Sequence, residues 1–117
     1  GIYYFRDLYG RPCEQLEHDM KLWWVHNESL IATLVAYAIT GDEYYAQWYE
    51  KLHEYIFKHF PDKEFGEWYG YLHRDGTVSH TQKGSLWKGP FHLPRCFILC
   101  DKILESLESG KELPELV

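Results

Sequence analysis

Two segments of this 117-residue chain read as helices that are apolar on most of their surface, and this feature limits the fold more than any other. Residues 27–40 carry apolar side chains nearly all the way round, with Asn27 as the expected cap and Gly41 as the stop. A second such helix is predicted from Pro94 to about Gly110. Helices of this kind must be buried among other elements.

A third predicted helix, between these two, is apolar on one side only. Asp42 caps it and it runs to about Phe60, with Glu and Lys side chains lying off the apolar stripe. Joined to its predecessor by a two-residue turn, it forms an αα-hairpin with one inner and one outer member. Two inner helices and one outer helix do not close a layer. We therefore interpret residues 1–117 as one partial domain of a larger α/α protein.

The remaining segments predict short β structure and loops. Residues 2–5 are aromatic and β-branched and favour a short strand. Residues 67–72 and 77–79 flank an Asp75-Gly76 turn and predict a small β-hairpin. A Gly-rich loop over residues 84–89 leads into the last helix.

Charge and cysteine content exclude several classes of partner. The net charge of −6, from 12 basic and 18 acidic residues, argues against binding to nucleic acid or to an anionic membrane surface. The longest apolar run is far shorter than the roughly 20 residues that cross a bilayer. Three cysteines, Cys13, Cys96 and Cys100, favour a reduced, cytoplasmic protein. The seven histidines show no paired metal spacing, so we expect no metal site.

An acid and a base are predicted at the starts of the two inner helices. Glu28 falls in the first turn of one helix, and His92 comes just ahead of the other. If these helices run parallel, both groups reach the same end of the fold. The helix dipole there stabilises an ionised carboxylate and a neutral imidazole, a pair suited to proton transfer. The aromatic side chains expected around this pocket are Trp23, Trp24, Trp68 and Trp87.

Simpler interpretations exist for each of these residues. Glu28 would only stabilise its helix, and His92 would be a structural histidine bonded to backbone. Arg95, one turn after His92, would be a surface ion-pair residue. The Trp23-Trp24 pair would belong to the core. Lys88 is expected to be solvated in a flexible loop.

Four ordered motifs carry a resemblance to a known family. They are residues 21–30 (KLWWVHNESL), 40–44 (TGDEY), 66–76 (GEWYGYLHRDG) and 87–95 (WKGPFHLPR). In order and spacing they resemble the C-terminal part of the N-acylglucosamine 2-epimerase family, also called renin-binding proteins. The resemblance implies an all-α fold, the last third of an (α/α)6 barrel of alternating inner and outer helices, with a small β-hairpin.

The resemblance also implies a chemistry. Family members interconvert N-acetyl-D-glucosamine and N-acetyl-D-mannosamine by removing the proton at C2 with one histidine and returning it with another. His92 matches the C-terminal catalytic histidine, and Glu28 matches an acidic residue that assists ring opening or holds the sugar. Trp23, Trp24 and Arg95 are expected to bind the substrate. The second histidine and an active-site arginine belong to the N-terminal part of the family and have no counterpart in this chain.

Further expectations concern the branch, the activator and the assembly. Pro90 stands where mammalian members carry a cysteine, which favours a bacterial-like branch. The chemistry needs no cofactor, although ATP activates many members allosterically. Residues 82–86 match a nucleotide loop too weakly to assign that site. The full-length protein is expected to be a cytoplasmic homodimer.

Two other functions stay open from the sequence. One is a related aldose–ketose isomerase or cellobiose 2-epimerase on the same barrel. The other is a non-catalytic interaction fragment, because half of the catalytic pair is missing from these residues. In either case the isolated 117-residue chain is expected to be inactive.

Overall fold

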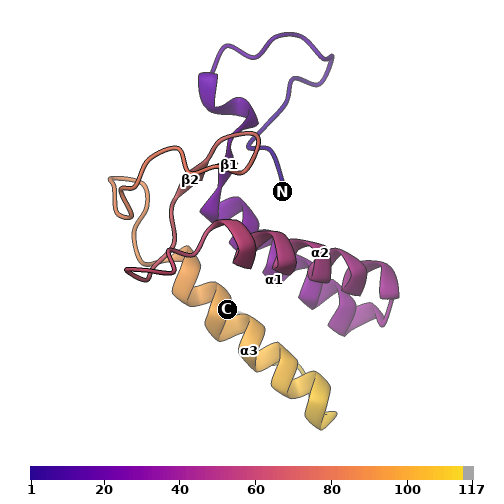
Figure 1. Ribbon diagram of the computed structural model, residues 1–117. Helices are drawn as coiled ribbons and strands as arrows, with labels where there is room; N and C mark the ends of the chain where they lie inside the picture. Colours follow the sequence, from indigo (N-terminus) through magenta and orange to yellow (C-terminus); the bar gives the residue numbers. More distant parts are fainter. Residues whose placement is uncertain (115–117) are drawn as a thin grey trace.

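The computed structural model describes residues 1–114, and this part of the chain is mostly helical. Three long helices are joined by loops, one short 3-10 helix and a two-stranded sheet (Figure 1). The elements in chain order are η1 (Leu16–Asp19), β1 (Lys21–Leu22), α1 (Trp23–Thr40), α2 (Glu43–His59), β2 (Tyr71–Leu72) and α3 (His92–Ser109). The short strands and the longer loops gather at the end of the molecule where α1 and α3 begin.

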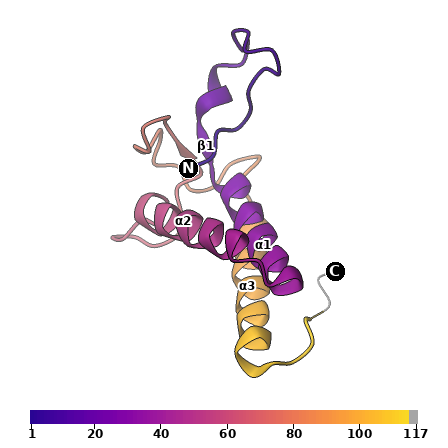
Figure 2. The same ribbon diagram turned by 90° about the vertical axis from the view of Figure 1, so that its right-hand side faces the viewer.

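Helix α1 is the centre of the packing and contacts both α2 and α3. Figures 1 and 2 show that α1 and α3 run in the same direction, whereas α2 returns alongside α1. This confirms the parallel inner helices and the αα-hairpin expected from the sequence. The buried residues that the three helices contribute to the core include Leu30, Ile31, Leu34, Leu52, Ile56, Cys96, Cys100 and Ile103.

Local sequence signals set three of the helix ends as predicted. Gly41 adopts a left-handed φ of 66° and its N–H donates to the Tyr37 carbonyl at 2.7 Å, which ends α1. The Asp42 carboxylate accepts from the Tyr44 N–H at 2.9 Å and caps α2. Gly110 ends α3 with a φ of 64°.

The start of α1 differs from the prediction by one turn. The helix begins at Trp23, so Asn27 is not its cap but a fully buried side chain within it. The Trp23 N–H donates to the Gly70 carbonyl at 3.0 Å, and this tertiary bond satisfies a donor that a capping side chain would otherwise serve. Glu28 consequently lies in the second turn of α1, where the dipole argument for its ionisation is weaker.

Helix α3 also begins earlier than predicted. Its first residue is His92, preceded by Phe91 in a helical conformation, and Pro94 is the third residue rather than the first. Proline is tolerated throughout the first turn, because none of those N–H groups has a partner within the helix. His92 is therefore part of the helix and shares its rigidity.

The strand predicted over residues 2–5 is wrong. The segment is extended, but it makes only two backbone hydrogen bonds to the stretch before β1, from Tyr4 to Met20 and from Phe5 to His18, each at 3.0 Å. These bonds are too few to count as a strand, and they attach the N-terminal segment alongside η1 and β1.

The predicted β-hairpin forms, but its first strand pairs mainly elsewhere. The turn around Gly76 is closed by a bond from the His73 N–H to the Thr77 carbonyl at 2.8 Å, and Leu72 forms a single bridge with Val78. The longer partner of β2 is β1, which runs antiparallel to it. This pairing joins the residues before α1 to the middle of the chain, and no local turn signal announces it.

Many large apolar side chains remain exposed on the helices. Helices α2 and α3 carry most of them, and we expect this of a partial domain. They include Ile39, Trp48, Phe57, Phe97, Ile98 and Leu104. Over residues 1–114, no helix combines the length and the apolar character that crossing a membrane requires.

Candidate active site

Three side chains meet between the N-terminal ends of α1 and α3. Glu28 comes from the second turn of α1, whereas His92 and Arg95 come from the first turn of α3. The Glu28 carboxylate lies 2.8 Å from Nδ1 of His92. Nη1 of Arg95 donates to both oxygens of the same carboxylate, at 3.0 and 2.7 Å. The structure therefore brings together the acid, the base and the arginine that the sequence singled out.

The environment of Glu28 favours its charged form. Partial burial raises the pKa of this carboxyl, but hydrogen bonds from His92 and Arg95, together with their charges, outweigh burial and hold the pKa below its usual value. An ionised Glu28 accepts a hydrogen bond, so Nδ1 of His92 is assigned as the donor. Nε2 is then the ring nitrogen left to exchange a proton with a bound molecule.

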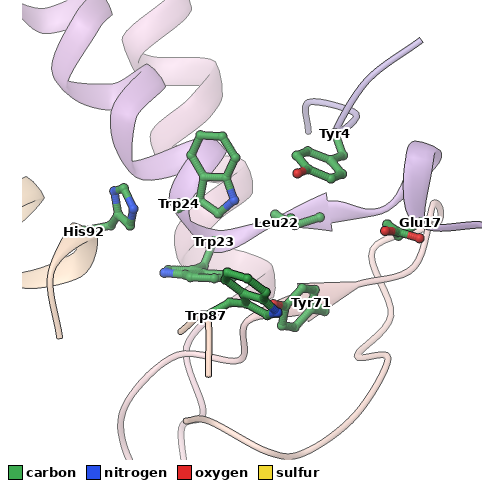
Figure 3. A pocket seen from close by; sticks show the side chains of 8 residues that line it. All are labelled: Tyr4, Glu17, Leu22, Trp23, Trp24, Tyr71, Trp87 and His92. Carbon is green, nitrogen blue, oxygen red and sulfur yellow. The ribbon is translucent and has the colours of Figure 1, made fainter. Parts of the chain in front are cut away.

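A cavity of about 520 Å³ lies beside His92 and is lined mostly by aromatic side chains (Figure 3). Both predicted tryptophans of α1 contribute to it. The cavity is bounded by Tyr4, Glu17, Leu22, Trp23, Trp24, Tyr71, Trp87 and His92. Its volume lies within the range of pockets that hold small molecules.

The aromatic rings set the orientation of the histidine. The Trp24 ring lies 5.7 Å from the His92 ring, tilted by 34°, and the Trp23 ring meets His92 edge-on at 6.4 Å. Tyr4 packs edge-on against Trp24 at 6.0 Å. Trp23 is almost fully buried, so it is both a core residue and a wall of the cavity. The core and ligand-platform interpretations of this tryptophan pair are therefore compatible.

Two expectations about the surroundings of the site are wrong. Trp68 does not line the cavity; it is buried in the core between Phe60, at 5.9 Å, and Phe97, at 5.5 Å. Lys88 is not solvated, because its side chain is only 4% exposed and is paired with the Glu67 carboxylate. The flanking glycines suggested a mobile loop, but packing against α1 decides the environment of Lys88.

Sequence reasoning missed four residues of the cavity, of which Leu22 is the last residue of β1. Tyr71 reaches it because β2 pairs with β1, and Tyr4 and Glu17 reach it from the N-terminal segment and η1. Tyr71 lies within one of the recognised motifs, which was an available signal. Tyr4 and Glu17 follow no pattern in the sequence, because only the tertiary pairing with residues 18–20 places them.

The described residues offer no metal centre. Among residues 1–114, no three His, Cys, Asp or Glu side chains converge in a way that would hold a metal ion. Cys13, Cys96 and Cys100 are free thiols, and the two sulfurs in α3 lie 4.0 Å apart. The polar cluster that this chain itself forms beside the cavity consists of the Glu28 carboxylate, the His92 imidazole and the Arg95 guanidinium.

Parallel inner helices with a polar cluster and an aromatic cavity at one end describe a protein of the α/α-barrel class. Residues 1–94 match the N-acylglucosamine 2-epimerase (GlcNAc 2-epimerase) family. The chain is 48% identical over 109 residues to N-acylglucosamine 2-epimerase from Bos taurus, which covers 93% of this chain and 26% of that protein. It is also 35% identical to cellobiose 2-epimerase from Eubacterium cellulosolvens, over 80% of this chain and 22% of that protein. The chain belongs to the N-acylglucosamine 2-epimerase family.

Solved structures agree on the fold. The crystal structure of a D-mannose isomerase superposes with a TM-score of 0.75 at 28% identity, covering 91% of this chain and 25% of that one. The chain spans about a quarter of the length of the proteins that it matches. It is thus part of an (α/α)6 barrel, as expected. The matched N-acylglucosamine 2-epimerases at 44–48% identity are mammalian, so the bacterial-like branch inferred from Pro90 stays a prediction.

Proposed function

We propose that this chain supplies the C-terminal half of the catalytic site of a sugar 2-epimerase, which interconverts N-acetyl-D-glucosamine and N-acetyl-D-mannosamine. The observation that carries the proposal is the hydrogen bond of 2.8 Å between Nδ1 of His92 and Glu28 beside an aromatic cavity. It fixes one ring nitrogen and leaves Nε2 for the substrate. Membership of the N-acylglucosamine 2-epimerase family supports the choice of reaction.

In the proposed reaction, His92 exchanges the proton at C2 of the open-chain sugar. Nε2 takes the proton from C2, the C2–H electron pair moves into a C1–C2 double bond, and the C1 aldehyde oxygen becomes negatively charged. Return of a proton to the opposite face of C2 gives the epimer. That step belongs to a second histidine, which the family resemblance assigns to the N-terminal part of the full-length protein.

Glu28 and Arg95 support this proton transfer in different ways. The Glu28 carboxylate orients the imidazole and stabilises the imidazolium that forms when Nε2 accepts the proton. Arg95 uses Nη1 to hold Glu28, and its other N–H groups can donate to an oxygen of the sugar. Stabilisation of the enediolate by such donors lowers the barrier to removal of the C2 proton.

The aromatic cavity suits a sugar ring. Trp24 is half-buried and Trp87 is exposed, and both line the cavity beside His92. The C–H groups of a sugar pack on aromatic faces of this kind. Trp23 and Tyr71 form a rigid pair behind them, with ring centres 5.3 Å apart. We assign substrate binding to this group, together with Arg95.

A second candidate activity is favoured by the names of two matched proteins. A D-mannose isomerase and a cellobiose 2-epimerase are similar to this chain, and each name describes a different use of a sugar. An aldose–ketose isomerase would return the proton to C1 rather than C2. The same His92 and Glu28 would serve that reaction, so the product distinguishes the two.

The remaining expectations form part of the proposal for the full-length protein. The free thiols support a reducing, cytoplasmic location. A homodimer that acts on a small amino sugar, without nucleic acid or a membrane as partner, is consistent with the net charge of −6. ATP activation stays a prediction. Residues 82–86 match a nucleotide loop only weakly, and the lysine of this segment, Lys83, is already paired with Asp62 at 2.6 Å. A non-catalytic interaction module is the alternative if no turnover is found.

Product analysis tests the proposal. The full-length protein is incubated with N-acetylmannosamine, mannose and cellobiose in separate reactions, and the products are identified by NMR. We expect N-acetylglucosamine from the first sugar. A ketose product would favour the isomerase, an epimer from cellobiose alone would favour the cellobiose 2-epimerase, and the absence of any product would favour the interaction module.

A further inference from the structure

We propose that Lys88 is a positioning residue for His92, and that its ion pair with Glu67 fixes the loop from which α3 starts. This inference rests on the proposed function, because it concerns the same site. Nζ of Lys88 lies 2.5 Å from Oε2 of Glu67, and the lysine side chain is only 4% exposed. A lysine so deeply buried is unusual in a loop and needs a partner for its charge.

The side chain of Lys88 passes between two elements of the site. Its Nζ lies 5.9 Å from the centre of the Trp23 ring, and its stem covers the backbone of Gly70. Trp23 in turn meets the His92 ring edge-on at 6.4 Å. Lys88 therefore supports the tryptophan that packs against the histidine. Because it also lies four residues before His92, it acts on the histidine through the chain as well.

Glu67 is held in place on the other side of the pair. Its φ of 61° lies in the left-handed region, which residues with a side chain rarely adopt. Oε1 of its carboxylate accepts from the Trp68 N–H at 2.7 Å, and its carbonyl accepts from the Asp62 N–H at 2.8 Å. These two bonds hold Glu67 where its carboxylate meets Lys88, and the residue thereby anchors the loop.

Gly70 provides the space that this arrangement needs. A Cβ at that position would lie 2.8 Å from Cδ of Lys88 and 3.5 Å from the Trp23 ring. The first distance is too short, so an alanine would displace the lysine without removing any charge. Gly70→Ala is therefore an independent way to disturb the position of Lys88.

The proposal is tested in the full-length protein with Lys88→Met and Lys88→Arg. Lys88→Met is expected to lower kcat about 10- to 100-fold with little change in KM, because a small displacement of a catalytic group is enough for such a loss. Lys88→Arg keeps the charge and is expected to recover most of kcat. The control is Lys51→Met, which removes the charge of an exposed lysine on α2 that lies over the Trp48 ring, away from Glu67 and Trp23. It is expected to leave kcat unchanged.

Gly70→Ala keeps the test decisive if Lys88→Met does not fold. Alone, it is expected to lower kcat as Lys88→Met does; combined with Lys88→Met, it is expected to add less than about twofold, because the two changes share one cause. A wild-type kcat in Lys88→Met or in Gly70→Ala would overturn the proposal. The proposal would also be overturned if the loss of kcat in the double variant equalled the product of the losses in the two single variants.

A second readout separates this inference from the proposed function. In the full-length protein with ¹³C-labelled histidine, the His92 ring signal is expected to shift in Lys88→Met and not in Lys51→Met. If the wild type turns over no sugar, the proposed function fails and this signal alone decides the positioning role. An unchanged His92 signal in Lys88→Met would overturn it.

Discussion

Acidification is expected to loosen the N-terminal segment from α1, because His26 is buried in its neutral form. The imidazole is fully buried and stacks on Tyr55 at 5.6 Å. Its Nε2 accepts from the Ile2 N–H at 3.0 Å, and its Nδ1 bonds to the Leu22 carbonyl at 2.7 Å. Protonation would replace the acceptor with a donor and break the bond to Ile2. That segment also carries Tyr4, so the cavity wall would be affected.

The size of the effect follows from the pKa of His26. The pKa of His26 is lowered to about 4, mainly by burial; the hydrogen bond to Leu22 opposes this shift and the nearby charge of Lys21 adds to it. The unfolded chain, with a histidine pKa near 6.5, binds more protons between these values. The contribution of neutral His26 to the free energy of unfolding is therefore fully present above about pH 6.5, and it is lost as the pH falls toward 4. Between pH 7 and 5 the loss from this group is about 2 kcal/mol.

Urea unfolding of the full-length protein at both pH values measures this loss. The control is His26→Gln, which keeps an acceptor near Ile2 but does not titrate. The wild type is expected to lose about 2 kcal/mol more than the variant on going from pH 7 to 5. Equal losses in the two proteins, or a His26 NMR signal that titrates near pH 6.5 in the folded state, would refute the reasoning.

Three further changes to the full-length protein have expected outcomes. Glu28→Gln, which removes the charge that orients His92, should lower kcat about 100-fold in the NMR epimerisation assay, and unchanged turnover would contradict its role. Trp24→Ala should raise KM about fivefold through loss of an aromatic face, and an unaltered KM would remove it from the sugar site. Gly41→Ala should cost about 1 kcal/mol in urea unfolding because of its left-handed φ, whereas Gly84→Ala, also in open space, should cost little.

Much of the helical framework was predictable, because local chemistry fixes it. Gly41, Asp42 and Gly110 set helix ends through backbone preferences that act within a few residues. The apolar surfaces of α1 and α3 reflect burial that any neighbour would provide. The meeting of Glu28 with His92 and Arg95 followed from two parallel helices with polar residues at the same end.

The errors lie where a tertiary contact replaces a local signal. A bond from Trp23 to Gly70 starts α1 one turn early, although the sequence has a good capping residue in Asn27. The burial of Lys88 depends on Glu67, 21 positions away in the chain. Such tertiary contacts override local helix and loop propensity, and the pattern of apolar residues in a single sequence does not indicate them.

Deuterium incorporation at C2 tests the central claim most directly. N-acetylmannosamine is incubated in D₂O with the full-length protein and with its His92→Gln variant, and loss of the C2 proton signal is followed by NMR. The account predicts exchange with the wild type and a rate at least about 100-fold lower with His92→Gln. Exchange that survives the substitution unchanged would show that His92, paired with Glu28, is not a base for the C2 proton.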